Sequence, residues 1–572
     1  MLDALDLPAI PEGTPFDQVM AMIVKSSPMF ELEEREIRGA TYTAFKNQPK
    51  SIRDALMIVL THGDKDFLVY EGERFSFKQV VDKAARLAQV LVDDMGLKKG
   101  ERVALSMRNY PEWVIAYMAI VGAGGVACLM NAWWQSEEME WALNDSDAVL
   151  LITDGFRFER GREVIEKMKL PTILVRDADV RHSLVTHYND ALLDSKKPMT
   201  WPPVELGPED VAHMLYTSGS TGFPKGAYSD HQAVIGVLMT WICLAIYTKM
   251  TAANPVPDDF QPSMLVGVPF FHVTGLLPMM MVSAIIGRKL VIMHKWDVER
   301  ACQLIEQEKI SSITGVPTMS YELASSPVTE KYDLSTLTDL GAGGAARPAE
   351  HVKMITEKFK GSRPGLGYGL TETNALGSVI SGDDYTARPT STGMATPPLM
   401  SFKIIDQDGN TLKTGERGEI CIKGMVNVIG YWKNPEATET AFRDGWFHTG
   451  DVGYLDDEGY LYIVDRLKDI IIRGGENVST LEVEAVIHAI DGVDDVMVFG
   501  LPDERLGEVV GAVVVTKSLT REQIIDEVSK HLASFNVPEH IWLQEDELPL
   551  IASGKLDRKN IKQSFREKFA AS

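Results

Sequence analysis

Short apolar runs alternate with longer amphipathic segments from about residue 65 to residue 200. The apolar runs are rich in β-branched and aliphatic residues, and residues 111–124 between two of them have a helical pattern. Parallel strands joined by crossover helices produce such an alternation. A second cycle of the same kind extends from about residue 210 to residue 400. The predicted strands are 102–107, 126–130, 148–153, 172–175, 263–269, 289–293 and 310–316.

The pattern changes after residue 400. Residues 401–465 alternate β-type residues with turn signals, which favours a small antiparallel unit. The chain then crosses a boundary at 466–469, and 470–572 is long enough for an α+β core of its own. Before the first cycle, residues 1–60 are typical of an amphipathic helical lead-in with loops. We therefore predict an α/β protein with an N-terminal domain of residues 1–465 and a smaller C-terminal domain.

Length and charge limit the classes of function. A chain of 572 residues exceeds the roughly 250–300 residues that one hydrophobic core usually holds, which also predicts more than one domain. The formal net charge is −24, which argues against general binding of nucleic acid or of an anionic membrane surface. If the substrates are anions, local positive groups must overcome this unfavourable field.

The longest apolar stretches are too short to indicate a membrane helix. Val234–Tyr247 and Leu276–Ile286 both fall short of the roughly 20 residues that a spanning helix needs, so we predict that they are core elements. The first residues are acidic and do not resemble a secretory signal. We expect a cytoplasmic protein without a transmembrane segment, and peripheral membrane contact remains open. The chain has four cysteines, isolated from one another in sequence, namely Cys128, Cys243, Cys302 and Cys421. Such isolated cysteines are typical of buried residues in a reducing compartment.

The most informative segment is glycine-rich and extends from Tyr216 to Gly226, between a predicted strand and a predicted helix. Glycines allow backbone N–H groups to approach an anion, hydroxyl groups add donors, and Lys225 supplies a positive charge for a phosphate. The segment is not a Walker A loop, because Pro224 precedes the lysine and Gly226 follows it. The candidate phosphate-binding residues are Thr217, Ser218, Gly219, Ser220, Thr221 and Gly222.

Residues 367–373, with the sequence GYGLTET, are the second signal. An aromatic side chain between glycines can stack on a nucleobase, and a carboxylate beside polyphosphate is best explained by Mg²⁺, which takes oxygen ligands.

The glycine-rich segment resembles the phosphate loop of the adenylate-forming superfamily. This superfamily includes acyl- and aryl-CoA synthetases, adenylation domains of peptide synthetases and beetle luciferases. The later motifs follow in the order of that family, so the resemblance covers residues from about 65 to 560.

The resemblance implies a role for each matching residue. Tyr368, between Gly367 and Gly369, is expected to pack on adenine, Thr371 to contact the α-phosphate region and Glu372 to hold Mg²⁺. The loop GAGGA resembles the adenine-side loop, with Gly343, Gly344 and Ala345 beside the nucleotide. His272 is expected between the adenylate and the acyl pocket.

The remaining motifs lie towards the C-terminus. From the residues alone, Asp451 offers two acceptor oxygens for ribose hydroxyls and Arg466 offers a planar donor fork. The resemblance makes both of them ribose ligands and makes Lys468 the hinge, within 466–469, about which a mobile C-terminal domain rotates. It also assigns Gly474 and Gly475 to the pantetheine tunnel and Lys555 to the carboxylate and the α-phosphate.

Together these features predict an ATP-dependent acid–CoA ligase that forms an acyl-adenylate and then a thioester. We expect ATP, Mg²⁺ and coenzyme A as cofactors, a carboxylic acid as substrate, no nucleic acid partner, and a monomer or homodimer. Apolar, methionine-containing stretches at 272–281 and 377–381 are candidate walls of the acyl pocket and favour a medium- or long-chain fatty acid. The alternatives are a bulky cyclic or aryl acid, or an enzyme of the same superfamily with an acceptor other than CoA.

Overall fold

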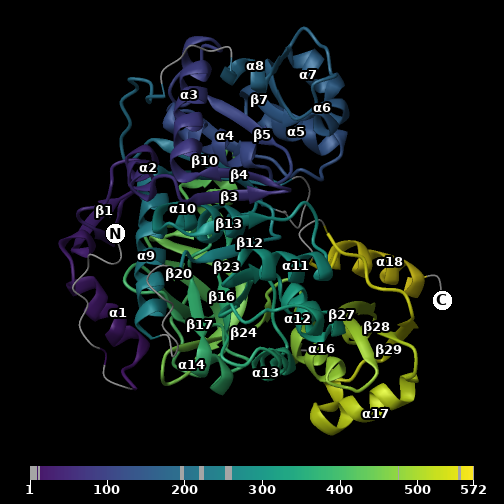
Figure 1. Ribbon diagram of the computed structural model, residues 1–572. Helices are drawn as coiled ribbons and strands as arrows, with labels where there is room; N and C mark the ends of the chain where they lie inside the picture. The colour runs from purple at the N-terminus through teal and green to yellow at the C-terminus, as the bar shows by residue number, and fades with distance from the viewer. Residues whose placement is uncertain are drawn as a thin grey trace.

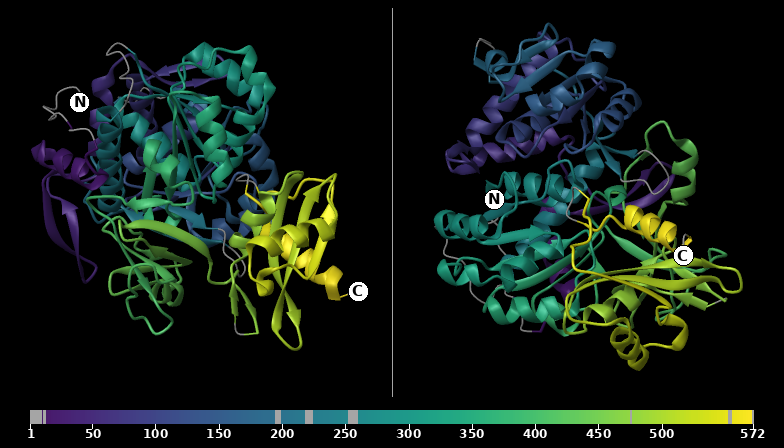
Figure 2. Two further views of the ribbon diagram at one scale, coloured as in Figure 1. Left: turned by 90° about the horizontal axis from the view of Figure 1, so that it is seen from below. Right: turned by 90° about the vertical axis from the view of Figure 1, so that its right-hand side faces the viewer.

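The computed structural model describes residues 10, 13–193, 199–217, 224–251, 260–474, 476–551 and 555–570. A large N-terminal part contains two extended sheets with their helices, and a smaller C-terminal unit, coloured yellow to yellow-green, lies against one side of it (Figure 1). Both further views also place this unit at the flank of the large part (Figure 2). The predicted α/β class, with a larger N-terminal and a smaller C-terminal domain, is confirmed.

The first sheet has 8 strands in the described part of the chain, in the order β21-β11-β10-β6-β5-β7-β8-β9. Its strands from β10 to β9 are parallel, whereas β11 pairs antiparallel with β10 and β21 pairs antiparallel with β11. Helix α4 (Pro111–Gly122) is buried over its whole length, which explains why its sequence is almost entirely apolar. The strands are β5 (Arg102–Ser106), β6 (Val126–Leu129), β7 (Ala148–Asp154), β8 (Thr172–Val175), β9 (Val185–His187), β10 (Val211–Thr217), β11 (Lys225–Asp230) and β21 (Gly430–Tyr431).

The second sheet has 14 strands among the described residues, and β12 to β16 form its parallel centre. The predicted antiparallel unit at 401–465 exists, but it is not separate, because Gly393 and Met394 of β18 pair with β24 and make it continuous with this sheet. The strands are β3 (Asp66–Tyr70), β4 (Glu73–Ser76), β12 (Ser263–Val266), β13 (Lys289–Ile292), β14 (Ser312–Gly315), β15 (Asp339–Gly343), β16 (Arg363–Tyr368), β17 (Ser378–Ser381), β18 (Gly393–Ala395), β19 (Ser401–Ile405), β20 (Gly418–Lys423), β22 (Phe442–Arg443), β23 (Trp446–Leu455) and β24 (Tyr460–Arg466).

The N-terminal segment differs from the predicted helical lead-in. Helices α1 (Phe16–Lys25) and α2 (Ile52–Val59) are present, but a hairpin of β1 (Leu32–Ile37) and β2 (Ala40–Phe45) lies between them. The strand pattern is weak in β1 because charged residues fill most of its positions, and pairing with β2 supplies the regular structure. The prediction for residues 1–60 was therefore wrong in this part.

Helices cover the faces of the two sheets (Figure 1). Among the described residues, α9 (His231–Met250) is the one helix long and apolar enough to cross a membrane by length and composition. It extends beyond the uncharged run seen in the sequence, and 67% of its apolar window is buried inside the protein. The remaining helices of the large part are α3 (Phe77–Asp93), α5 (Ser136–Asp145), α6 (Gly155–Arg160), α7 (Arg162–Met168), α8 (Tyr188–Leu193), α10 (Val282–Ile286), α11 (Val298–Glu308), α12 (Pro317–Ser325), α13 (Ala349–Lys358), α14 (Gly382–Ala387) and α15 (Pro435–Ala441).

The C-terminal unit has its own core around a sheet of 5 strands in the described part of the chain. The structure has both strands and helices after residue 470, as the predicted α+β core requires. They are β25 (Ile471–Arg473), β26 (Glu476–Val478), α16 (Thr480–His488), β27 (Val493–Asp503), β28 (Gly507–Thr516), α17 (Arg521–His531), β29 (His540–Gln544) and α18 (Arg558–Ala570).

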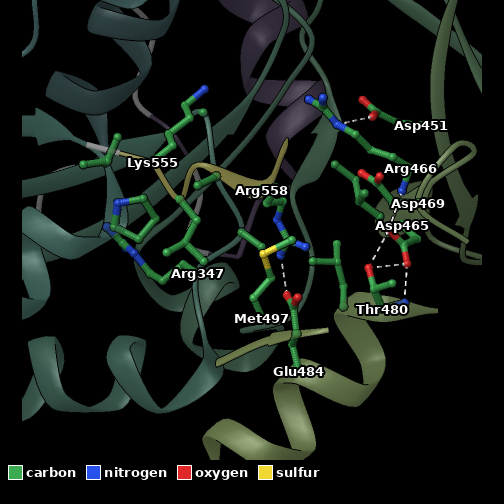
Figure 3. A pocket seen from close by; sticks show the side chains of 18 of the residues that line it. Arg347, Asp451, Asp465, Arg466, Asp469, Thr480, Glu484, Met497, Lys555 and Arg558 are labelled. Carbon is green, nitrogen blue, oxygen red and sulfur yellow. Dashed lines mark hydrogen bonds and ion pairs between the residues drawn. The ribbon is translucent and has the colours of Figure 1, made fainter. Parts of the chain in front are cut away.

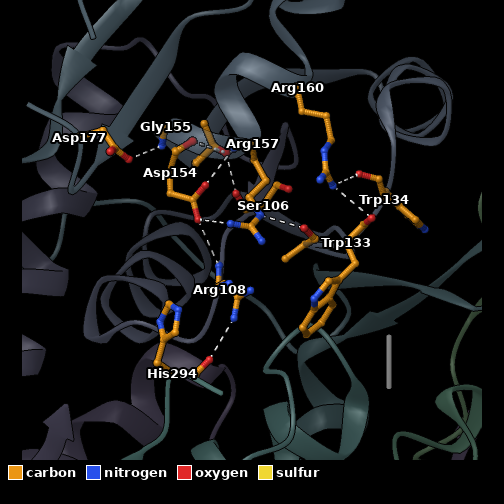
Figure 4. Close-up of polar contacts among 12 residues, drawn as sticks. Ser106, Arg108, Trp133, Trp134, Asp154, Gly155, Arg157, Arg160, Asp177 and His294 are labelled. Carbon is orange, nitrogen blue, oxygen red and sulfur yellow. Dashed lines mark hydrogen bonds and ion pairs between the residues drawn. The ribbon is translucent and has the colours of Figure 1, made fainter. Parts of the chain in front are cut away.

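Polar contacts join the two large sheets near the carboxyl ends of β5 and β7 (Figure 4). Arg108 donates to the carbonyl oxygen of His294 across 3.1 Å, from the first sheet to the second. Behind it, the buried Asp154 and Arg157 form an ion pair of 2.9 Å. Arg160 donates to the carbonyl oxygens of Trp133 and Trp134, and thereby fixes the loop that follows β6. This network sets the position of two tryptophans that line the cavity described next.

Candidate active site

A large cavity, with a volume of ≈ 2760 Å³, lies between the large part and the C-terminal unit. Its lining comes from the carboxyl ends of the central parallel strands, from the antiparallel strands β23 and β24, and from α16, β27 and α18. Ligands of α/β proteins commonly bind at the carboxyl ends of parallel strands. Charged side chains from both sides point into this space (Figure 3).

Thr217 and Lys225 flank the glycine-rich loop and both line the cavity. They face each other in the last register pair of β10 and β11, so the loop between them begins and ends at the cavity wall. Ser218, Gly219, Ser220, Thr221 and Gly222 lie outside the described residues. Their roles in phosphate binding stay a prediction, and the positions of the two flanking residues agree with it.

Thr371 and Glu372 lie in a short turn of 3₁₀ helix, η6 (Thr371–Thr373), directly after β16. Both line the cavity, and burial raises the pKa of the Glu372 carboxyl. The Tyr431 hydroxyl donates to Glu372 Oε1 across 2.8 Å, while Lys225 Nζ lies 5.0 Å from the centre of the Tyr431 ring. The predicted metal carboxylate and the predicted phosphate lysine therefore contact the same aromatic side chain.

Glycines at the ends of two paired strands form another wall. Gly343 of β15 is opposite Gly367 of β16, and each strand continues with further cavity residues, namely Gly344, Ala345, Tyr368 and Gly369. A β-carbon at Gly369 would lie 2.7 Å from the carbonyl carbon of Ala375, so the tight turn after β16 requires glycine there. This wall offers bare backbone to a flat ligand.

Asp451 and Arg466 face each other across β23 and β24, with Arg466 Nε 3.4 Å from Asp451 Oδ1. Asp451 is 5% exposed, and burial raises the pKa of its carboxyl although Arg466 opposes this shift. The Tyr368 hydroxyl donates to Asp451 Oδ2 across 2.7 Å. The predicted adenine residue and the predicted ribose residue are therefore adjacent.

Lys555 reaches this cavity from the C-terminal unit (Figure 3). A β-carbon on Gly344 would lie 3.1 Å from Lys555 Nζ, so the ammonium group contacts the end of β15. Burial, and then the charge of Arg466, lower the pKa of Lys555. The nearby His272 lies at the cavity wall, where burial, and then Lys555, lower its pKa to about 3. His272 Nε2 is buried and, within the described residues, has no hydrogen-bond partner.

Of the other predicted residues of the C-terminal region, Lys468 lies at the cavity and Gly474 lies away from it. Lys468 lines the cavity, and burial lowers its pKa. Gly474 does not line the cavity. It lies at the tip of the β25–β26 hairpin, where its N–H donates to the carbonyl oxygen of Leu506 across 2.7 Å. Gly475 lies outside the described residues. The structure thus brings Lys555 to the cavity and leaves Gly474 away from it.

The predicted walls of the acyl pocket line this cavity only at the start of the first stretch. His272, Val273 and Thr274 line the cavity, but the following residues, 275–281, form a π-helix whose apolar side chains pack in the core. Residues 377–381 also do not line it. Apolar residues that do line the cavity follow β6, β12 and β14, namely Trp133, Val268, Phe271, Val316 and Pro317.

Two features of the site were not predicted from the sequence. Tyr431 was missed because a lone tyrosine after a valine-rich stretch carries no motif, and its pairing with β11 brings it to Lys225. The contacts between β24 and α16 were also missed. Buried Asp465 accepts hydrogen bonds from the backbone N–H and the hydroxyl of Thr480, and Ser479 Oγ donates to the Val464 carbonyl oxygen across 2.8 Å.

Comparisons with known proteins agree with this geometry. The family model "AMP-binding enzyme" matches residues 58–432, and the model "AMP-binding enzyme C-terminal domain" matches residues 482–555. A long-chain-fatty-acid–CoA ligase of Bacillus subtilis is 31% identical over 535 residues, covering 88% of this chain and 92% of the relative. The long-chain-fatty-acid–CoA ligase FadD13 of Mycobacterium tuberculosis is 32% identical over 500 residues, covering 87% and 94%.

Solved structures are similar over almost the whole chain. ATP-bound MatB from Rhodopseudomonas palustris has a TM-score of 0.79 and 28% identity, covering 90% of this chain and 99% of that protein. A fatty acyl CoA synthetase of Mycobacterium tuberculosis has a TM-score of 0.68 and 30% identity, covering 91% and 99%. The sequence motifs, the cavity between two units and these similarities lead to one conclusion: the chain belongs to the AMP-binding enzyme family.

Proposed function

We propose that this protein is an ATP-dependent acid–CoA ligase that converts a fatty acid to its acyl-adenylate and then to acyl-CoA. The observation that carries the proposal is the position of Lys555, which reaches from the C-terminal unit to Gly344 in the cavity that Asp451, Arg466 and Lys225 also line. Binding of a nucleotide alone does not need a lysine from a second unit. Joining a carboxylate to a phosphate requires additional positive charge, which this lysine supplies, because the two anions repel each other.

The first step depends on positioning and electrostatics. A carboxylate oxygen attacks the α-phosphorus of ATP, the bond to the bridging oxygen breaks, and pyrophosphate leaves. Lys225 and Lys555 stabilise the negative charge around that phosphorus, and Asp451 holds the ribose. No protein nucleophile is needed. The glycine wall beside Tyr368 suits the flat adenine ring.

The carboxylate of Glu372 fits a magnesium ion. It is a hard oxygen donor at the cavity wall, near Lys225, and only one of its two oxygens accepts the hydrogen bond from Tyr431. When bound, Mg²⁺ would supply positive charge to the phosphate oxygens. Glu372 is the residue that we propose to hold it.

The second step forms the thioester. The sulfur of CoA attacks the acyl carbonyl carbon, the bond to the phosphate oxygen breaks, AMP leaves and the thiol proton is lost. We propose that the C-terminal unit rotates about Lys468 between the steps, so that Lys555 withdraws and the hairpin with Gly474 and Gly475 approaches. The opposite placement of Lys555 and Gly474 in this structure supports two alternating arrangements.

A fatty acid is the proposed acid because apolar residues line part of the cavity and the curated relatives described above are named long-chain-fatty-acid–CoA ligases. The test is a panel of fatty, cyclic, aryl and amino acids incubated with ATP, Mg²⁺ and CoA, with products identified by mass spectrometry. We expect acyl-CoA and AMP, in the highest yield with medium- or long-chain fatty acids. A higher yield from an aryl or cyclic acid would contradict the assigned substrate class, and formation of ADP would contradict the reaction.

A further inference from the structure

Tyr431 occupies a fixed position between two groups that the proposed reaction uses. Its strand, β21, pairs antiparallel with β11 through Ala227 and Tyr228. Its backbone N–H donates to Thr438 Oγ1 across 2.9 Å. Backbone contacts on both sides of the residue therefore fix where its side chain begins.

The next residue, Trp432, fixes the strand from the opposite face. Its N–H donates to the Gly226 carbonyl oxygen across 2.7 Å, and its indole Nε1 donates to the Asp145 carbonyl oxygen across 3.0 Å. The Arg102 guanidinium lies 5.4 Å from the centre of its ring. Because successive side chains of a strand point to opposite faces, anchoring Trp432 on one face directs Tyr431 into the cavity.

Tyr431 contacts a cation and a carboxylate from two distant segments of the chain. Its hydroxyl donates to Glu372 Oε1 across 2.8 Å, and the ammonium of Lys225 lies 5.0 Å from its ring centre. An ammonium over an aromatic face is attracted by the ring without forming a salt bridge. Each of the two groups thus has a defined contact on the same side chain.

Lys225 and Glu372 do not form an ion pair with each other in the part of the chain that the structure describes. Direct pairing would consume the positive charge needed for phosphate and occupy the carboxylate needed for a cation. Tyr431 instead contacts the carboxylate through its hydroxyl and the ammonium through its ring, and neither contact neutralises a charge. This leaves the lysine charge and one carboxylate oxygen available to ligands.

We propose that Tyr431 is a positioning residue, which keeps Lys225 and Glu372 apart and oriented so that one binds polyphosphate and the other binds the accompanying divalent cation. The inference rests on the proposed function. It predicts two separable effects, because the hydroxyl serves the carboxylate and the ring serves the lysine.

The experiment compares Tyr431→Phe, which removes only the hydroxyl, with Tyr431→Leu, which removes the ring as well. Tyr188→Phe is the control, because the Tyr188 hydroxyl is buried without a hydrogen-bond partner among the described residues and lies in α8, outside the cavity lining. Two quantities are measured for each variant: the affinity of the enzyme–nucleotide complex for Mn²⁺, from the electron paramagnetic resonance of free Mn²⁺, and the Kd of ATP in EDTA by calorimetry.

We expect Tyr431→Phe to weaken Mn²⁺ binding about tenfold or more, as loss of one hydrogen bond to a charged group implies, with the metal-free Kd of ATP within about twofold of wild type. Tyr431→Leu should additionally weaken metal-free ATP binding about threefold or more, because the lysine loses its aromatic contact. Tyr188→Phe should change neither quantity.

Unchanged Mn²⁺ affinity in Tyr431→Phe would overturn the inference, and so would an equal loss of both affinities in that variant. If Tyr431→Leu does not fold, the phenylalanine variant alone decides the metal effect. A wild-type enzyme that binds no nucleotide would instead contradict the proposed function, so the two failures are distinguishable.

Discussion

At the residue scale, the site depends on charged side chains whose burial is offset by close partners. Asp451 is buried beside Arg466 and accepts from Tyr368, while Glu372 accepts from Tyr431. Lys555 has no such carboxylate partner among the described residues, and its pKa is lowered. An unneutralised ammonium in a cavity is a suitable group to meet an anionic substrate.

Replacing Lys555 should separate the two half-reactions. Lys555→Ala removes the positive charge that we propose to lie beside the α-phosphate, so formation of the acyl-adenylate should slow by about 10²–10³-fold or more. Conversion of added acyl-adenylate to acyl-CoA should stay within about threefold of wild type, since the proposed rotation withdraws the lysine at that step. Single-turnover assays of each half-reaction test this. Lys530→Ala, at an exposed lysine of α17, is the control. Equal loss of both half-reactions in a folded variant would refute the separate roles.

We expect the Asp451 carboxylate to contribute to the binding of ATP. Asp451→Asn loses the charged acceptor that Tyr368 contacts and that we assign to ribose, so the KM for ATP should rise about tenfold or more. The KM for the acid should change much less. Steady-state kinetics with each substrate varied in turn measure both values. A selective rise in the KM for the acid would show that the ribose assignment is wrong.

At the element scale, the sequence predicted the strands well where both of their faces are buried. The parallel strands β5 to β8 and β12 to β14 were found because buried parallel strands are continuous apolar runs. The hairpin β1–β2 was missed, since charged residues fill most positions of β1 and hide its strand pattern, although β2 carries buried residues. Most of the stretch proposed as an acyl-pocket wall is a π-helix in the core, whose composition resembles that of a pocket wall.

The contact between β24 and α16 joins residues on either side of the proposed hinge. Asp465 precedes the proposed hinge and Thr480 follows it, so rotation about Lys468 would have to break their hydrogen bonds. These bonds are therefore expected to favour the arrangement that keeps Lys555 in the cavity.

Thr480→Val removes the hydroxyl donor but keeps the shape and the backbone N–H. We expect acyl-adenylate formation to slow about three- to tenfold, because loss of one buried hydrogen bond shifts the population away from that arrangement, while the thioester step is unchanged or faster. Rapid-quench measurement of each half-reaction tests the shift. Thr440→Val, at an exposed threonine of α15, is the comparison. Slower thioester formation in Thr480→Val would rule out this role.

At the scale of the whole molecule, the motifs predicted which residues would line the same cavity, but not the contacts between their side chains. Lys555 and Gly344 are separated by more than two hundred residues in sequence, and the family resemblance alone brought them together before the structure did. The arrangement of Tyr431 between Lys225 and Glu372 depends on the pairing of β21 with β11, which no local pattern indicates. The burial of several histidines was also not predicted from the sequence.

Buried neutral histidines should make the fold sensitive to acid. Burial lowers the pKa of His231 from 6.5 to about 4, so its contribution to stability is present above pH 6.5 and is lost as the pH falls towards 4. Between about pH 7.5 and about pH 5 this one group should cost about 2 kcal/mol. His231→Gln should be less stable at neutral pH but should lose correspondingly less on acidification. Urea unfolding at both pH values measures the difference, and parallel declines would contradict the assignment.

The central claim is that groups from both units surround one ATP molecule and join an acid to its α-phosphate before CoA takes part. The most direct test is exchange of labelled pyrophosphate into ATP with a fatty acid present and CoA absent. We predict exchange that requires the acid and Mg²⁺ and that disappears in Lys555→Ala. Absence of exchange with every acid tested, although ATP binds, would contradict the account.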